Sequence, residues 1–181
     1  RLRNEGHAVW GVRNQILQGL AITLALWAVL LLWLGWLVFP FLLAASAWTN
    51  FQLTSANYVE HYGLLRLKEA DGRYERCQPR HSWNSNHIVT NLVLYQLQRH
   101  SDHHAHPTRS FQALRHFEHA PQLPGGYASM LLPAYFPSWW FGMMDQRVVD
   151  HYEGDLSKVN MDPERREELL AKYAKPVAEV S

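Results

Sequence analysis

Histidines gather in one part of this 181-residue sequence, because most of its 11 histidines lie between residues 81 and 119. The densest group is His100, His103 and His104, in the segment LQRHSDHH. Side chains three and four residues apart share one face of a helix, so these three imidazoles would project together. Neutral imidazole binds iron, zinc, copper and nickel. The spacing therefore predicts a metal site, although a plain cluster of surface histidines would show the same spacing.

The expected carrier of this group is one helix over residues 82–106. Ser82 can cap its N-terminus, and Pro107 disfavours helical backbone at the residue before it. Apolar residues lead into the histidines at helical spacing, which argues against a fully solvated helix. The residues of this stripe are Val89, Val93, Leu97, His100 and His104.

A fourth candidate ligand is His61, in the segment NYVEHYGL at residues 57–64. It follows a long uncharged stretch, and an ionisable side chain at the end of a membrane helix is a candidate functional residue. A histidine that caps the C-terminus of a helix explains the same position. Glu60 and Asp102 each neighbour one of the candidate ligands, and each is a candidate acceptor for the distal N–H of an imidazole.

The uncharged stretch covers residues 14–59, which contain no Asp, Glu, Lys or Arg. One membrane-spanning helix needs about 20 mainly apolar residues, so the stretch is long enough for two. Gly35 and Pro40 lie near its middle, where a hairpin would turn. We therefore expect helices over residues 14–34 and 40–60. The alternative, a buried helix pair in a soluble protein, needs a larger domain to cover it.

Basic residues flank the uncharged stretch on both sides and place both of its ends in the cytoplasm. They are Arg1, Arg3, Arg13, Arg66, Lys68, Arg73 and Arg76. The sequence thus predicts an all-α membrane protein in which a transmembrane helical hairpin precedes a mainly helical cytoplasmic metal-binding region. Its expected parts are a cytoplasmic lead-in at residues 1–13, the hairpin at 14–62, a His-rich catalytic region at 63–144 and a polar tail at 145–181.

Composition excludes several other classes. The net charge is +1 and no basic stripe stands out, so nucleic acid is not an expected partner. The single cysteine, Cys77, excludes a disulfide framework and a Cys₄ metal site within this chain. Residues 119–144 are also uncharged, but four prolines interrupt them, which favours a segment that lies on a membrane or covers the site. The chain begins without Met, and we expect further sequence upstream.

Four segments carry a family resemblance. They are NYVEHYGL at 57–64, LQRHSDHHAHPTRSFQALR at 97–115, LPGGY at 123–127 and GDLSKVNMDP at 154–163. Together they resemble segments of the bacterial integral-membrane alkane 1-monooxygenases. Members of that family have six transmembrane helices and two earlier histidine boxes, neither of which occurs here. The resemblance implies that this chain is the C-terminal portion and that an N-terminal portion of the same enzyme is missing.

The resemblance also implies a cofactor and a reaction. The cofactor is a non-haem di-iron centre, two iron ions held almost wholly by histidines. His61 matches one family ligand, and His100, His103 and His104 match the third histidine box, whereas the histidines at 81, 87, 106, 116 and 119 match no ligand position. The implied reaction is terminal hydroxylation of medium-chain n-alkanes to 1-alkanols with O₂, on the cytoplasmic side of the bacterial inner membrane. No substrate-binding residue is identified, because the apolar residues of the hairpin are equally explained by contact with membrane lipid.

The implied electron donor is rubredoxin, a small acidic iron–sulfur protein that rubredoxin reductase reduces. A basic cytoplasmic face could dock it, although the ordinary positive charge of cytoplasmic segments explains several of its members. The residues are Arg66, Lys68, Arg73, Arg76, Arg80, Arg99, Arg109 and Arg115. Two other functions stay open: a related His-box hydroxylase or desaturase acting on acyl or alkylaromatic substrates, and a His-rich membrane metal-binding or transport protein. Transporters place polar ligands within their spans, which disfavours the latter.

Overall fold

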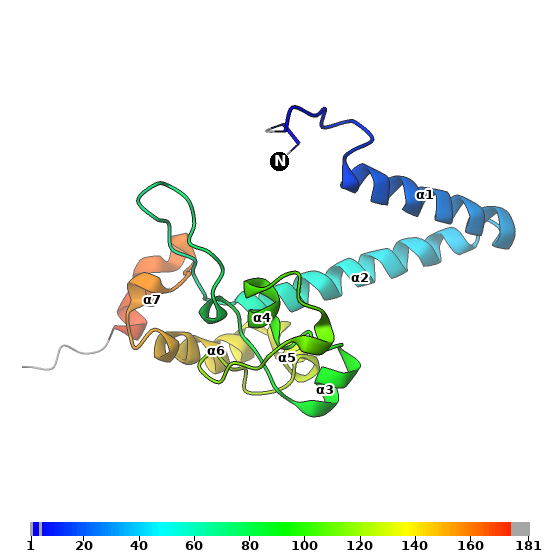
Figure 1. Ribbon diagram of the computed structural model, residues 1–181. Helices are drawn as coiled ribbons and strands as arrows, with labels where there is room; N and C mark the ends of the chain where they lie inside the picture. The colour runs from blue at the N-terminus through cyan, green and yellow to red at the C-terminus, as the bar shows by residue number, and fades with distance from the viewer. Residues whose placement is uncertain (1, 4, 175–181) are drawn as a thin grey trace, which may run out of the picture. The chain divides into compact units, whose positions relative to one another are not determined.

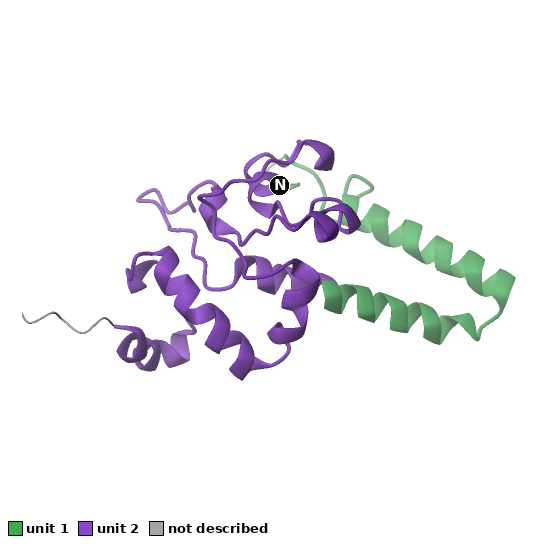
Figure 2. Cartoon of the chain, turned by 90° about the horizontal axis from the view of Figure 1, so that it is seen from below, with its two compact units in different colours: residues 1–52 green, residues 53–181 purple. Residues whose placement is uncertain are grey.

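The computed structural model describes residues 2–3 and 5–174, and within these residues it is mainly helical and contains no β-strand (Figure 1). The predicted fold class is confirmed at that level. The longer elements are α1 (Gln15–Leu34), α2 (Val38–His61), α3 (Ile88–Val93), α4 (His100–Ala105), α5 (Tyr127–Ala134), α6 (Pro137–His151) and α7 (Arg166–Tyr173). Short 3₁₀ helices lie at Pro79–His81, Phe111–Ala113, Leu156–Lys158 and Pro163–Arg165. The chain forms two compact units, residues 1–52 and 53–181, whose boundary falls inside α2 (Figure 2).

The first unit contains α1 and the first part of α2. The side-chain oxygen of Asn14 caps α1 by accepting a hydrogen bond from a backbone N–H of the first turn at 3.0 Å. Gly35 ends the helix at a φ of 81°, which glycine adopts without the steric cost of a Cβ, and its N–H donates to the Leu31 carbonyl at 2.9 Å. Trp27 and Phe39 then make an edge-to-face contact across the turn.

Among the described residues, α1 is the one helix that is long and apolar enough to cross a membrane. None of its residues is buried within the structure. A helix that is apolar on all sides needs an apolar environment, either lipid or other protein. The polar residues between Thr49 and Asn57 make α2 less apolar, although it carries no charge before Glu60.

The core of the second unit forms where the end of α2 meets α5 and α6. Val59, Trp140 and Met144 are fully buried there, in one cluster with Trp83 and Tyr127. Trp83 connects the parts of this core: its backbone N–H donates to the carbonyl of Glu60, and its own carbonyl accepts from the Tyr127 hydroxyl at 2.9 Å. The segment that follows residue 81 is thus fixed against the last turn of α2.

A glycine allows the chain to leave α2 close to α6. Gly63 has a φ of 70°, and a Cβ at this position would lie 2.6 Å from a methyl group of Val148. Any larger residue would meet both the steric cost of the left-handed backbone and this contact. The close approach keeps the end of α2, and with it His61, against the core.

The single helix expected over residues 82–106 is wrong. The structure has two short helices, α3 and α4, joined by a turn in which Tyr95 and Gln96 have φ angles of 50° and 59°. The apolar stripe is not buried either, because Val89 and Val93 are 73% and 68% exposed. The histidines of α4 are therefore not the continuation of a buried apolar stripe.

Gln98 explains the break. Its side chain is fully buried, and its Oε1 accepts hydrogen bonds from the Tyr127 N–H at 2.8 Å and the Thr90 hydroxyl at 2.9 Å. Its Nε2 donates to Asn91 Oδ1 at 3.0 Å. A buried amide needs partners for both of its ends, and α3 supplies them only by folding back over Gln98. Tertiary hydrogen bonds thus override the helical pattern of the sequence.

The C-terminal elements differ in part from the polar tail expected at residues 145–181. α6 passes through residue 145 without a break, and its Val148 and Val149 belong to the core. A helical segment begins at Asp162-Pro163: the Asp162 side chain accepts from the Glu164 N–H at 3.0 Å, and α7 follows the 3₁₀ turn.

We expect Gln98→Leu to lower the free energy of unfolding by roughly 2–4 kcal/mol, because the Tyr127 N–H and the α3 side chains lose buried partners. Urea unfolding of the protein, followed by tryptophan fluorescence, measures this change. The matched control is Gln112→Leu at an exposed position, which should stay within about 0.5 kcal/mol of the unmutated protein. Equal stability of the two variants would contradict the role given to Gln98.

Candidate metal centre

Three imidazoles from two distant segments meet in the second unit. His61 is the last residue of α2, and His100 and His104 lie one turn apart on α4. The Nε2 atoms of His61 and His100 are 3.3 Å apart, and those of His100 and His104 are 2.7 Å apart. One ring nitrogen from each residue lies within 4.8 Å of the other two. We refer to His61, His100 and His104 as the His cluster.

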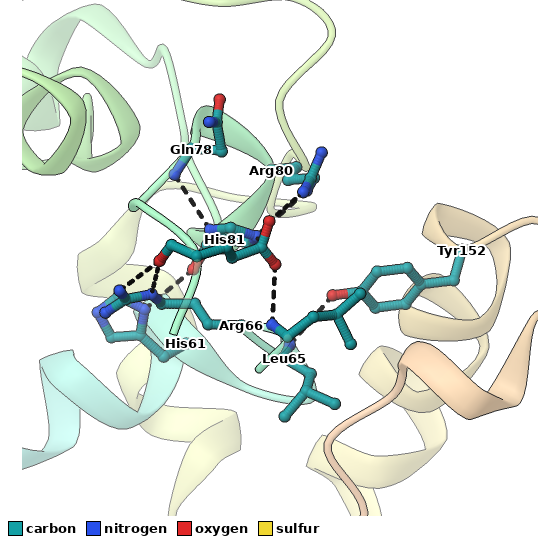
Figure 3. A network of polar contacts seen from close by, with 9 residues as sticks. His61, Leu65, Arg66, Gln78, Arg80, His81 and Tyr152 are labelled. Carbon is teal, nitrogen blue, oxygen red and sulfur yellow. Dashed lines mark hydrogen bonds and ion pairs between the residues drawn. The ribbon is translucent and has the colours of Figure 1, made fainter. Parts of the chain in front are cut away.

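The orientation of His61 is set by the carbonyl group of His81. Nδ1 of His61 lies 3.1 Å from that carbonyl oxygen (Figure 3). A carbonyl only accepts hydrogen bonds, so Nδ1 carries the proton and donates it. In the neutral ring the lone pair then resides on Nε2, which faces the His cluster. Metal-binding histidines commonly donate their other N–H in this way, which fixes both ring orientation and tautomer.

The segment that carries His81 is held by further polar contacts. His81 is buried, and its Nδ1 accepts a hydrogen bond from the Gln78 backbone N–H at 3.0 Å (Figure 3). Its Nε2 lies 3.2 Å from a carboxylate oxygen of Glu75. Burial lowers the pKa of His81 and so favours the neutral ring that accepts from Gln78. These contacts keep the His81 carbonyl where His61 needs it.

The buried face of α4 is attached to the same segment. The Ser101 backbone N–H donates to the side-chain oxygen of Asn84 at 3.0 Å, and the Ser101 hydroxyl donates to the Pro79 carbonyl at 2.6 Å. Asn84 is itself buried and donates to the carbonyl of Ser82 at 2.8 Å. Residues 79–84 therefore contact α4 on one side and His61 on the other, which brings the ligand-bearing segments together.

The electrostatics of the His cluster keep its central imidazole neutral. Burial, and after it the proximity of His104 and His61, lowers the pKa of His100 to about 3. Burial followed by the proximity of His61 and His103 also lowers the pKa of His104. Neutral imidazole is the form that binds a metal ion, and the lowered pKa values of His100 and His104 favour that form.

The arrangement of these lone pairs fits a cation. Nε2 of His100 faces Nε2 of both other cluster members, and its buried Nδ1 has no hydrogen-bond partner among the residues that the structure describes. One N–H cannot serve two neighbouring nitrogens, and lone pairs that face one another repel. Two imidazole nitrogens that bind one ion at about 2.1 Å lie about 3.0 Å apart at a right angle and about 3.4 Å apart in a tetrahedral site, close to the two spacings at His100, 2.7 and 3.3 Å. The His cluster thus fits a metal ion with nitrogen ligands.

His103 and Glu60 lie beside the His cluster. His103 is exposed, and its ring centre is 6.0 Å from that of His100 and 5.7 Å from that of His104. Glu60 is buried, and its Oε2 lies 3.2 Å from Nε2 of His100. Glu60 was expected to accept the distal N–H of a ligand, but it contacts Nε2 of His100, the nitrogen that faces the His cluster. The distal N–H of His61 is instead donated to the His81 carbonyl.

Asp102 fastens a loop to α4. It is fully buried, and it accepts hydrogen bonds from the Arg109 side chain, from the Arg115 backbone N–H at 2.8 Å and from Nδ1 of His106 at 2.9 Å. Burial alone would raise its pKa, but the hydrogen bonds from Arg115 and Arg109 lower it to about 2. None of these partners in the described part of the chain belongs to the His cluster. Asp102 instead holds residues 106–115 against the helix that carries two cluster histidines.

The sequence profile of the fatty acid desaturase family matches residues 3–134, a stretch that includes the whole His cluster. The chain belongs to the fatty acid desaturase family. Its relatives include the alkane 1-monooxygenase of Acinetobacter baylyi, 54% identical over 96% of this chain and 42% of the relative. The alkane 1-monooxygenase of Ectopseudomonas oleovorans is 55% identical over 96% of this chain and 43% of the relative.

A more distant relative of this desaturase-family chain is the xylene/toluene monooxygenase hydroxylase component of Pseudomonas putida. It is 29% identical over 86% of this chain and 43% of the relative. The chain spans less than half of the length of the relatives it matches. The resemblance to alkane 1-monooxygenases that the sequence motifs indicated is confirmed.

Sequence reasoning missed the residues that position the His cluster of this family member. His81 acts through its main-chain carbonyl, which leaves no side-chain signature. Asn84 and Gln98 lie in a stretch, residues 81–98, that contains no charged side chain. Amides in such a stretch are candidates for buried hydrogen-bonding residues, so this pattern was available as a signal.

We expect Asp102→Asn to destabilise the protein by about 3 kcal/mol or more, because Arg109 and Arg115 lose the buried carboxylate that they bind. Thermal unfolding of the intact protein measures the change. Asp155→Asn is the matched control, since Asp155 forms an exposed pair with Lys158 and its loss should cost much less. A control variant as unstable as Asp102→Asn would show that Asp102 has no special role.

Proposed function

We propose that this chain is part of an iron-dependent membrane monooxygenase that converts medium-chain n-alkanes to 1-alkanols with O₂. The observation that carries the proposal is the His cluster, in a chain more than half identical to proteins named alkane 1-monooxygenase over nearly its whole length. Because the chain spans less than half of those relatives, the activity is assigned to the full-length protein.

The proposed cofactor is a pair of non-haem iron ions. His61, His100 and His104 would hold iron through Nε2, and His103 beside them would complete this chain's share of the ligands. Four imidazoles are too few to surround two ions, so ligands from outside this chain are part of the proposal. When bound, the iron supplies the activation of O₂ and the oxidation of the C–H bond.

The residues of this chain hold and orient the site. The His81 carbonyl keeps the His61 proton on Nδ1, and burial keeps His100 neutral. Glu60 contacts His100, and we assign it the role of holding that ring in place, while Asp102 fastens the loop over α4. An alkane offers no hydrogen-bonding group, so selection of its terminal carbon depends on the shape of an apolar cavity.

We further propose that residues 14–62 form a two-span hairpin in the bacterial inner membrane, with the lead-in at 1–13 and the catalytic region that begins at residue 63 in the cytoplasm. The outward-facing apolar side chains of α1 support the first span. Residues 14–59 carry no charged side chain, which supports the second span. The basic residues at both flanks of this stretch support the orientation.

The proposed electron donor is rubredoxin, which rubredoxin reductase supplies with electrons. Insertion of one oxygen atom while the other leaves as water requires two electrons, and the single cysteine leaves no Cys₄ iron–sulfur site in this chain. Arg109 and Arg115 bind Asp102 and Arg73 pairs with Asp71, so the exposed Arg66, which binds a neutral carbonyl, is better placed to attract an acidic partner, together with Lys68 and Arg76.

A second candidate reaction is hydroxylation of an alkyl group on an aromatic ring. The relative named as a xylene/toluene monooxygenase component favours it, at lower identity than the alkane 1-monooxygenases. The same metal centre would serve both reactions, and the shape of the apolar cavity would separate them.

The full-length protein in membranes, given octane, O₂ and reduced rubredoxin, should form 1-octanol. Gas chromatography of the products measures it, with xylene as the competing substrate. Product from xylene alone would favour the alkylaromatic reaction, and an alkene from octane would favour a desaturase.

Alanine at His61, His100, His103 or His104 should lower the iron content of the full-length protein and abolish 1-octanol formation, because each change removes a nitrogen ligand. The matched control is His106→Ala, which alters an exposed imidazole bound to Asp102 and should keep both. Full iron and activity in His103→Ala, together with their loss in His106→Ala, would contradict the ligand assignment.

The hairpin places Trp36 and Ala70 on opposite sides of the membrane. In a cysteine-free background, Trp36→Cys should react with an impermeant thiol reagent from the periplasmic side and Ala70→Cys only from the cytoplasmic side. Labelling of both positions from one side would refute the two-span arrangement.

A further inference from the structure

The third helix has the reverse polarity of a helix on the surface of a water-soluble domain. Its large apolar side chains are the exposed ones: Ile88, Val89, Leu92 and Val93 are 76%, 73%, 74% and 68% exposed. We refer to these four residues as the α3 apolar face. A contiguous patch of exposed aliphatic side chains indicates a surface that contacts something other than water.

The polar face of α3 is fixed toward the interior. Asn91 is buried and accepts from Gln98, and the Thr90 hydroxyl donates to the same buried amide. Gly126 closes the space behind Thr90, because a Cβ there would lie 2.7 Å from the Thr90 hydroxyl oxygen. The helix therefore cannot turn its apolar face inward without breaking these hydrogen bonds.

The charged side chain next to α3 is Arg99. Its guanidinium donates to Asn86, which also accepts from Asn91 of α3, whereas Arg109 and Arg115 are bound to the buried Asp102. The partners of Arg99 are neutral, the Leu114 carbonyl and the Asn86 side chain. Excess positive charge beside an exposed apolar face is complementary to an anionic phospholipid surface.

We propose that the α3 apolar face lies in the interfacial layer of the phospholipid bilayer, with its aliphatic side chains among the acyl chains and Arg99 at the headgroups. Tyr95, which is 69% exposed at the end of α3, is of the type enriched at that depth. The inference rests on the membrane location proposed above and is independent of the reaction. It places the segment that leads into the His cluster against lipid, the phase that dissolves an apolar substrate.

The test uses the full-length protein in bilayers of phosphatidylcholine and phosphatidylglycerol, in a background without other cysteines. Leu92→Cys carries an environment-sensitive fluorophore, and lipids with a nitroxide near the headgroup should quench its emission about twofold or more. Aqueous iodide should quench it weakly. Val89→Cys, the second labelled position on the same face, should behave alike, and both positions are exposed, so the label does not disturb the core.

Two further labels separate the possible failures. Leu26→Cys at the middle of α1, tested with lipids that carry the nitroxide deep in the acyl chain, reports the membrane location, and Arg73→Cys on an exposed turn should be quenched by iodide and not by the lipids. If the Leu26 label is quenched by lipids while the Leu92 label is shielded from both quenchers, the α3 apolar face packs against protein and the inference is wrong. Iodide access at Leu92 would also overturn it. An unquenched Leu26 label would overturn the membrane location itself.

Discussion

Lone pairs on neighbouring imidazoles repel one another unless a proton or a metal ion lies between them, and this constraint governs the His cluster. Nδ1 of His61 donates its proton to the His81 carbonyl, on the side away from the cluster, and burial lowers the pKa of His100 and keeps that ring neutral. The nitrogens that remain face each other at 2.7 and 3.3 Å. A neutral imidazole has one nitrogen with a free lone pair, and a metal ion between the facing Nε2 atoms would replace a proton there and remove the repulsion.

Buried polar side chains, more than apolar packing, hold the segments that supply these nitrogens. Asn84 accepts a hydrogen bond from α4 and so attaches that helix to the segment of residues 79–84. Gln98 connects α3 to α5, and Asp102 holds the loop that follows α4. Short helices bury too little apolar surface to fix their own positions, so specific hydrogen bonds do it instead. The same arrangement leaves the apolar residues of α3 outside. Site geometry and the proposed lipid contact thus have a common origin.

The sequence predicted the chemistry of the site better than its local structure. Spacing grouped His100 with His104, and the end of a long uncharged stretch singled out His61. His103, which the same spacing groups with them, lies beside the cluster, with its ring centre 6.0 Å from that of His100 and 5.7 Å from that of His104, and its role as a ligand stays a prediction. The break at Tyr95 and Gln96 depends on hydrogen bonds to residues far along the chain. A periodicity argument, which uses local sequence alone, does not contain them.

The central claim is that His61, His100 and His104 bind one metal ion through Nε2. Cryo-electron microscopy of the full-length, iron-loaded protein at side-chain resolution tests it most directly. The account predicts density for an ion at about 2.0–2.2 Å from all three Nε2 atoms, with Nδ1 of His61 still on the His81 carbonyl. An ion bound through Nδ1 of His61, or an iron centre that leaves any of the three imidazoles unbound, would contradict the account.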